Sequence, residues 1–184
     1  PPLSYASAAD WEATGAPEAR AKLQKSVYGM MPDRTESRVI ERKTLDAAAF
    51  GGAGRLEEYR IGASMTFGDV TVEAQSGGDD GFIMNVVSPA TGDGPFPVIL
   101  METFCPRWST IPDARISGAP EQMKKRGGFG LETYIFGRYI CTPPVEEILS
   151  AGYAVAAIYP GEVAPDRREE GLAEMRRLTA GYGD

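Results

Sequence analysis

Two short segments carry the side chains with the clearest chemical potential. Arg107 and Trp108 stand in the sequence Cys-Pro-Arg-Trp, and Glu162 and Asp166 stand in Pro-Gly-Glu-Val-Ala-Pro-Asp. A guanidinium can hold a carboxylate, an indole offers a flat apolar surface to a sugar ring, and carboxylates accept hydrogen bonds from sugar hydroxyls. These four residues are therefore candidates for the rim of a substrate site.

Each candidate also has an ordinary structural explanation. Arg107 can be a solvated surface charge, and Trp108 can be a packing residue. Glu162 can orient its own loop, and Asp166 can cap a helix running from Arg167 to Leu178. Both interpretations stay open at the level of sequence.

A complete Ser-His-acid triad is excluded within this sequence, because it contains no histidine to act as the base. Ser64 lies in Gly-Ala-Ser-Met-Thr, which lacks the glycine that a nucleophile elbow needs two residues after the serine. No catalytic nucleophile, acid or base can therefore be named here. The glycine-rich segments lack the nucleotide-binding spacings, so no cofactor is expected.

The two cysteines, Cys105 and Cys141, have neither CxxC spacing nor histidine partners, so no metal site is expected. They either form a disulfide in an oxidising compartment or remain buried free thiols. Adjacent acidic pairs such as Glu57-Glu58 lack the support that would make them catalytic, and we expect them on solvated surface.

Composition narrows the class of protein. The chain has 184 residues, of which 42% are hydrophobic and 24% charged, as in globular domains. Its net charge of -7 argues against nucleic-acid or anionic-membrane partners, and its apolar runs, such as Val98 to Met101, are too short to cross a bilayer. The start at Pro1 fits a processed periplasmic or secreted precursor or a trimmed chain, so the localisation stays open.

The first part of the chain predicts one helix and several antiparallel strands. Apolar residues recur at helical spacing from Ala16 to Met30, and Gly29 with Pro32 ends the run. Segments rich in β-formers follow, and their alternation predicts strands with one wet face. These strands are expected at Ser37 to Leu45, Arg55 to Ala63 and Asp69 to Ala74.

The second part predicts parallel strands. Phe82 to Val87 and Val98 to Phe104 are mostly apolar, as expected for strands covered on both faces. A helix capped by Thr142 and extending to Ala151 precedes a third apolar strand, Tyr153 to Tyr159. A strand, a crossover helix and a strand join parallel partners, so Val98 to Phe104 and Tyr153 to Tyr159 should be parallel.

These parallel strands position the candidate residues. Arg107 and Trp108 follow the carboxyl end of one strand, and Glu162 and Asp166 follow the carboxyl end of the other. Open α/β sheets hold their sites at this edge. The 38-residue excursion from Phe104 to Cys141 is long enough to form a lid or a binding rim.

The order of these segments resembles a known family. Four segments carry the resemblance: Val-Tyr-Gly-Met-Met-Pro at the end of the first helix, Phe-Ile-Met-Asn-Val-Val-Ser-Pro, Phe-Pro-Val-Ile-Leu-Met-Glu-Thr-Phe, and Gly-Tyr-Ala-Val-Ala-Ala-Ile-Tyr-Pro-Gly-Glu. Together these motifs resemble the glucuronoyl-esterase and acetylxylan-esterase-like branch of the α/β-hydrolases. The resemblance implies an α/β fold over residues 1–184: the N-terminal portion of one hydrolase domain, with an antiparallel start and then parallel strands with crossover helices.

The same resemblance implies an activity and a division of labour. The complete domain would be a serine esterase acting on carbohydrate-type or other small esters, with its nucleophile and histidine in a C-terminal portion that this sequence lacks. The loop after the Val98 strand would supply a backbone N–H to the oxyanion hole, at Phe104 or Cys105. The alternative is a non-catalytic, truncated hydrolase-like protein that binds a ligand or partner.

Overall fold

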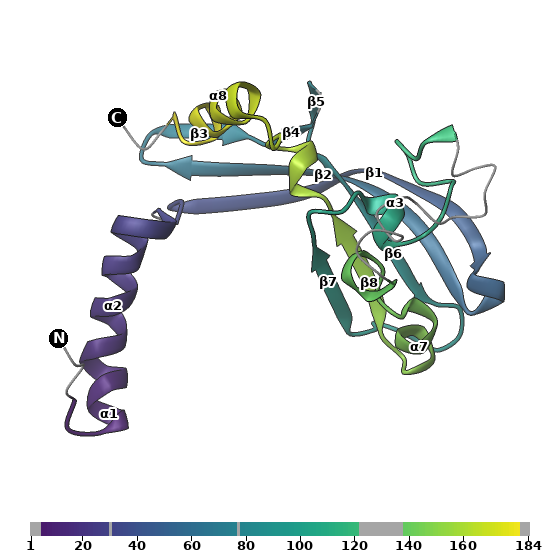
Figure 1. The fold of residues 1–184 in the computed structure, drawn as a ribbon, viewed down its shortest axis with the longest axis horizontal. Coiled ribbons are helices and arrows are strands. Elements are labelled where there is room, and N and C mark those ends of the chain that lie inside the picture. The colour runs from purple at the N-terminus through teal and green to yellow at the C-terminus, as the bar shows by residue number, and fades with distance from the viewer. Residues whose placement is uncertain (1–4, 30, 77, 122–137, 181–184) are drawn as a thin grey trace. The chain divides into compact units, whose positions relative to one another are not determined.

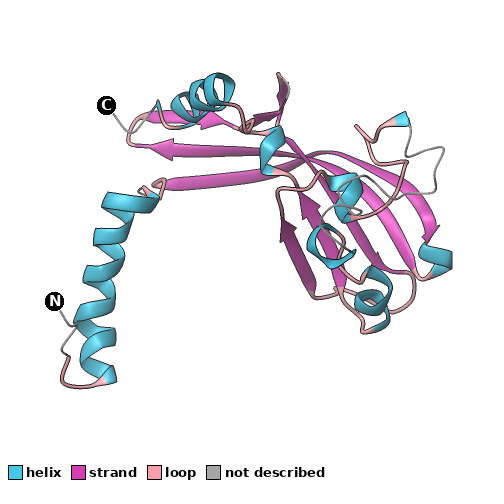
Figure 2. Cartoon of the chain, viewed as in Figure 1, coloured by secondary structure: helices cyan, strands magenta, loops and turns pink. Residues whose placement is uncertain are grey.

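The computed structural model describes residues 5–29, 31–76, 78–121 and 138–180. The chain divides into two compact units, Pro1–Arg34 and Thr35–Asp184. Most of the long excursion after Phe104, including its glycines at 127, 128 and 130, lies outside the described residues. The two units are therefore described one after the other (Figures 1 and 2).

The first unit is helical and begins earlier than predicted. Its consecutive segments are α1 (Ala8–Asp10), η1 (Trp11–Gly15), α2 (Ala16–Leu23) and η2 (Gln24–Tyr28). The Ser7 hydroxyl caps the start by accepting from the Asp10 N–H at 3.0 Å. Gly29, with φ of 79°, ends the last turn as predicted, and Met30 lies outside the described residues. The expected helix is confirmed, but its apolar residues Leu23 and Val27 are exposed.

The second unit is built on a mixed six-stranded sheet. The strand order is β1-β2-β6-β8-β7, and β3 pairs with β2 beside this path (Figure 1). The strands are β1 (Arg34–Ala49), β2 (Gly54–Phe67), β3 (Val70–Glu73), β6 (Phe82–Pro89), β7 (Val98–Glu102) and β8 (Ala154–Ile158). A separate two-stranded sheet pairs β4 (Gln75–Ser76) with β5 (Asp79–Asp80). The helical segments of this unit are η3 (Phe50–Gly52), α3 (Arg107–Thr110), α6 (Arg138–Cys141), α7 (Val145–Ser150), η4 (Pro160–Glu162) and α8 (Arg168–Leu178).

The pairing confirms the predicted change from antiparallel to parallel. β2 pairs antiparallel with β3 and with β6, and β6 pairs antiparallel with β8. β7 and β8 are parallel, with Leu100 opposite Ala156. The crossover helix α7 packs on β8, as the sequence pattern requires.

The two parallel strands differ in burial. β8 lies between β6 and β7, and its residues from Ala154 to Ala157 are almost fully buried. β7 lies at the edge of the sheet, where Val98 and Leu100 are 55% and 59% exposed. The prediction that the Val98 strand is covered on both faces is therefore wrong for this chain, because α3 and α7 pack on β8.

Two predicted helix caps are also wrong. The residue that precedes α7 is Pro144, and the Thr142 hydroxyl instead donates to the Ser109 carbonyl at 2.6 Å. The residue that precedes α8 is Arg167 rather than Asp166, and no side chain caps this helix. Thr142 thus connects α6 and α7 to the segment around α3.

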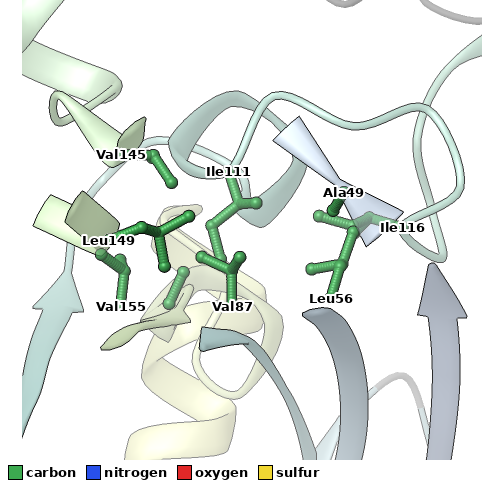
Figure 3. Packing of buried hydrophobic residues seen from close by; sticks show 9 residues of the cluster. Ala49, Leu56, Val87, Ile111, Ile116, Val145, Leu149 and Val155 are labelled. Carbon is green, nitrogen blue, oxygen red and sulfur yellow. The ribbon is translucent and has the colours of Figure 1, made fainter. Parts of the chain in front are cut away.

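The hydrophobic core lies between the sheet and the segments that follow β7 and α6. Leu56 from β2, Val87 from β6 and Val155 from β8 contribute sheet residues, and all three are fully buried. Figure 3 shows Ile111, Val145 and Leu149 gathered over Val87 and Val155. This core fixes the loops after β7 on one face of the sheet.

Candidate functional site

A cleft opens where the parallel strands end. It has a volume of about 400 Å³ and lies at the carboxyl ends of β7 and β8. Phe104 and Asp166, two of the sequence candidates, lie in its wall. The full lining is Glu102, Thr103, Phe104, Tyr159, Pro160, Gly161, Ala164 and Asp166.

A second hollow of about 320 Å³ adjoins this cleft and shares Glu102, Tyr159, Pro160 and Ala164 with it. Its other wall includes Met65 from β2 and Phe82 from β6. Apolar walls with a few polar groups are typical of small-molecule sites. The carboxyl edge of the sheet therefore offers a cleft lined by both polar and apolar residues next to a hollow that is almost wholly apolar.

Arg107 and Glu162 join the two loops that border the cleft. The Arg107 Nε donates to Glu162 Oε2 at 2.8 Å, and its Nη2 donates to Glu162 Oε1 at 2.7 Å. The Arg107 side chain is 3% exposed and that of Glu162 is 21% exposed. This is a bidentate ion pair, the geometry in which a guanidinium binds a carboxylate most strongly.

The other side of Arg107 contacts the sheet. Its Nη1 donates to Asn85 Oδ1, and the same nitrogen lies 3.7 Å from Glu58 Oε2. Its Nη2 also donates to the Ser117 carbonyl at 3.3 Å. Glu58 and Asn85 are both buried, so residues of β2 and β6 hold the guanidinium on the side that faces the sheet.

Glu58 remains a good acceptor despite its burial. It accepts from the Ser117 hydroxyl at 2.7 Å, from the Ser117 N–H at 3.0 Å and from Asn85 Nδ2 at 3.2 Å. Burial raises the pKa of Glu58, but these hydrogen bonds and the positive charge of Arg107 outweigh it and leave the pKa below its usual range. The carboxylate is therefore charged at neutral pH.

These contacts decide between the two interpretations of Arg107. It is 2% exposed as a residue, so the view of it as a solvated charge is wrong. Its donors already meet Glu162, Asn85 and Ser117, and a substrate carboxylate would have to displace one of them. Glu162 orients its loop through this ion pair, which was one of the two roles expected for it.

The loop after β7 is fixed by local bonds and by a disulfide. The Cys105 N–H donates to Thr103 Oγ1 at 3.1 Å, and the Thr103 hydroxyl lies 3.3 Å from that of Thr110. Cys105 and Cys141 are disulfide-bonded, with their Cα atoms 5.7 Å apart, so the disulfide alternative is the one found. The Phe104 side chain is 65% exposed at the cleft.

Trp108 is placed as a packing residue. It is partly buried against the hydrophobic core rather than in the wall of the cleft. The edge of its ring lies 2.9 Å from the point where a Cβ on Gly118 would be, and Gly118 has φ of 83°. The indole therefore fixes the course of the loop after α3.

Sequence reasoning missed four polar residues of this region. The sequence pattern predicts Glu57 and Glu58 on solvated surface, and this prediction is wrong because both residues are buried. Asn85 and Glu102 stand in otherwise apolar strands, and such an isolated polar residue was a usable indication. Ser117 carried no comparable indication, because it lies in a loop.

Among the residues that the structure describes, no group of three or more His, Cys, Asp or Glu side chains could hold a metal ion. No helix in this part of the chain is long and apolar enough to span a membrane.

Comparison with known proteins defines the fold class. No protein-family model matches the sequence, and no curated protein matches it. Solved structures do match, among them glucuronoyl esterases and a promiscuous CE15 esterase. The mixed sheet matches the N-terminal part of their fold.

Three of these structures give the extent of the similarity. A glucuronoyl esterase from Solibacter usitatus is 22% identical with a TM-score of 0.53, and the match covers 93% of this chain and 41% of that one. A promiscuous CE15 esterase from a marine bacterial metagenome is 20% identical with a TM-score of 0.57, and the match covers 94% of this chain and 42% of that one. A CE15 glucuronoyl esterase from Teredinibacter turnerae is 17% identical with a TM-score of 0.51, and the match covers 97% of this chain and 38% of that one. The chain thus spans about two fifths of the length of these esterases.

Proposed function

We propose that this chain is the N-terminal portion of a serine esterase that acts on carbohydrate-type esters, and that it forms one wall of the substrate site. The observation that carries the proposal is the cleft at the carboxyl ends of β7 and β8, in a sheet that matches part of the glucuronoyl-esterase fold. Ligands of open α/β sheets bind at this edge.

The proposal assigns the nucleophile, the acid and the histidine to a C-terminal portion of the same domain. This chain has no histidine, so it cannot provide the base. The edge of β7 supports this division, because Val98 and Leu100 are exposed and an apolar hollow of about 300 Å³ lies between Ile99 and α7. Apolar sheet edges are normally covered, so we expect the next strand of the domain to pair with β7.

The loop after β7 supplies a backbone N–H to the oxyanion hole in this proposal. Phe104 lies in the wall of the cleft, whereas the Cys105 N–H donates to Thr103 Oγ1. The position of Phe104 in the wall of the cleft makes it the first candidate for the donor, and Cys105 is the second. Pro106 keeps the loop in place, since its carbonyl accepts from the Ser109 N–H at 2.8 Å.

A replacement of Pro106 tests the role of this loop. Pro106→Gly in the complete esterase should lower kcat about 10- to 100-fold and leave KM nearly unchanged, because a displaced donor weakens transition-state binding alone. Equal kcat values for the variant and the wild type would remove this loop from the oxyanion hole.

The experiment that tests the function begins with the reading frame after the codon for Asp184. A Gly-x-Ser-x-Gly motif followed by an acid and a histidine would support the esterase, and a stop codon would support the alternative of a non-catalytic binding protein. The product of the whole frame should hydrolyse a glucuronic acid methyl ester or acetylated xylo-oligosaccharides. The 184-residue chain alone is the control and should be inactive.

A further inference from the structure

We infer that Arg107 and Glu162 are positioning residues that set the distance between the two loops bordering the cleft, an inference that rests on the proposed function. The first loop comprises residues 103–110, and the second comprises residues 159–164. The bidentate ion pair connects them with two bonds of 2.8 and 2.7 Å. Neither residue lies in the wall of the cleft, so they act through their neighbours.

The ion pair is connected to the cleft wall through short, hydrogen-bonded turns. Arg107 begins α3, three residues after Phe104, and its carbonyl accepts from the Ile111 N–H at 2.9 Å. Glu162 ends η4, and its N–H donates to the Tyr159 carbonyl at 3.0 Å. A shift of either side chain is therefore passed to Phe104 on one side and to Tyr159 on the other.

The sheet provides the fixed reference for this ion pair. Asn85 and Glu58 contact Arg107 from β6 and β2, and the fully buried Asn85 also donates to Glu58. The guanidinium thus stands between the charges of Glu58 and Glu162. Loss of Arg107 would leave two carboxylates without their cation, so its replacement would chiefly unfold the protein. Glu162 is the better residue to change, because it is less buried.

Glu162→Ala in the complete esterase tests the positioning role. It should lower kcat about 10- to 100-fold with KM within about twofold of wild type, because small displacements of groups around the reacting atoms cost that much. Glu162→Gln keeps the shape and one acceptor, and should give an intermediate kcat. Glu170→Gln is the matched control, since Glu170 of α8 pairs at 3.4 Å with Arg167 and both side chains are exposed. It should leave kcat unchanged.

Amide hydrogen exchange provides a readout that does not depend on activity. In Glu162→Ala, amides of residues 103–110 and 159–164 should both exchange faster, while the amides of β6 and β8 keep their protection. Faster exchange in the second loop alone, or over the whole sheet, would overturn the inference. A loss of kcat in Glu170→Gln as large as that in Glu162→Ala would also overturn the inference. An inactive wild-type protein would refute the proposed function, and the exchange experiment would still decide on the ion pair.

Discussion

The disulfide between Cys105 and Cys141 should contribute a large part of the stability of the second unit. The two cysteines are 36 positions apart, and the bond connects the loop after β7 to the end of α6. A cross-link removes loop-closure entropy from the unfolded chain, by an amount that grows with the logarithm of loop length. For a loop of this length the relation gives about 4 kcal/mol at 25 °C.

The perturbation is the double replacement Cys105→Ala with Cys141→Ala. Both residues are almost fully buried, and alanine fits their space without introducing a polar group. With a urea m-value of about 2 kcal/mol/M, a loss of about 4 kcal/mol lowers the urea midpoint by about 2 M. The assay is urea unfolding followed by circular dichroism, with the oxidised wild-type protein as reference.

Reductant provides the control for this experiment. Dithiothreitol added to the unfolded wild-type protein before refolding should move its midpoint toward that of the double variant, and should leave the double variant unchanged. A midpoint within about 0.5 M of wild type in the double variant would refute the reasoning, because the cross-link would then contribute less than about 1 kcal/mol.

Three further replacements test the core, the buried acid and one turn. Leu56→Ala should cost about 2–5 kcal/mol in urea unfolding, because Leu56 is fully buried, whereas Val39→Ala on the exposed side of β1 should cost far less. Glu58→Gln should be less stable than wild type at pH 7, and the difference should shrink as the pH falls below about 4.3. A lowered folded-state pKa gives its full stabilisation above the unfolded pKa and loses it as the pH falls through the folded pKa. A difference that is constant from pH 7 to pH 3 would contradict the pKa shift. Gly81→Ala should lower the melting temperature, because Gly81 has φ of 77° and a Cβ there would overlap the Ile61 carbonyl; an unchanged melting temperature would contradict this.

The parallel pairing of β7 with β8 could be predicted because it depends on local pattern. Apolar runs, a helix between them and the handedness of crossovers were sufficient for that prediction. The position of β7 at the sheet edge could not be predicted from these features. The position of a strand in the sheet depends on which other strands pair with it, and no local pattern in the sequence specifies that. The burial of Val98 and Leu100 depends in turn on the position of β7.

The sequence pattern predicts where the candidate residues lie in the fold better than it predicts what they contact. Phe104 and Asp166 lie at the cleft because they follow strand ends, which the sequence pattern locates. The ion pair of Arg107 with Glu162 joins residues 55 positions apart, and Ser117 meets Glu58 across 59 positions. Such contacts depend on tertiary packing, for which a single sequence contains no local pattern.

The strand order also has a consequence for synthesis on the ribosome. β7 is made before β8, yet within the described residues β8 is the strand with which it pairs, and Val98 must wait for Ala154. At about 5 to 20 residues per second, the roughly 56 residues between them take about 3 to 11 s to add. During that interval β7, with its apolar side chains, is a nascent strand without its neighbour, the state in which unpaired edges recruit other chains. Chaperone dependence during translation should therefore be concentrated in the interval between completion of residue 102 and emergence of residue 158.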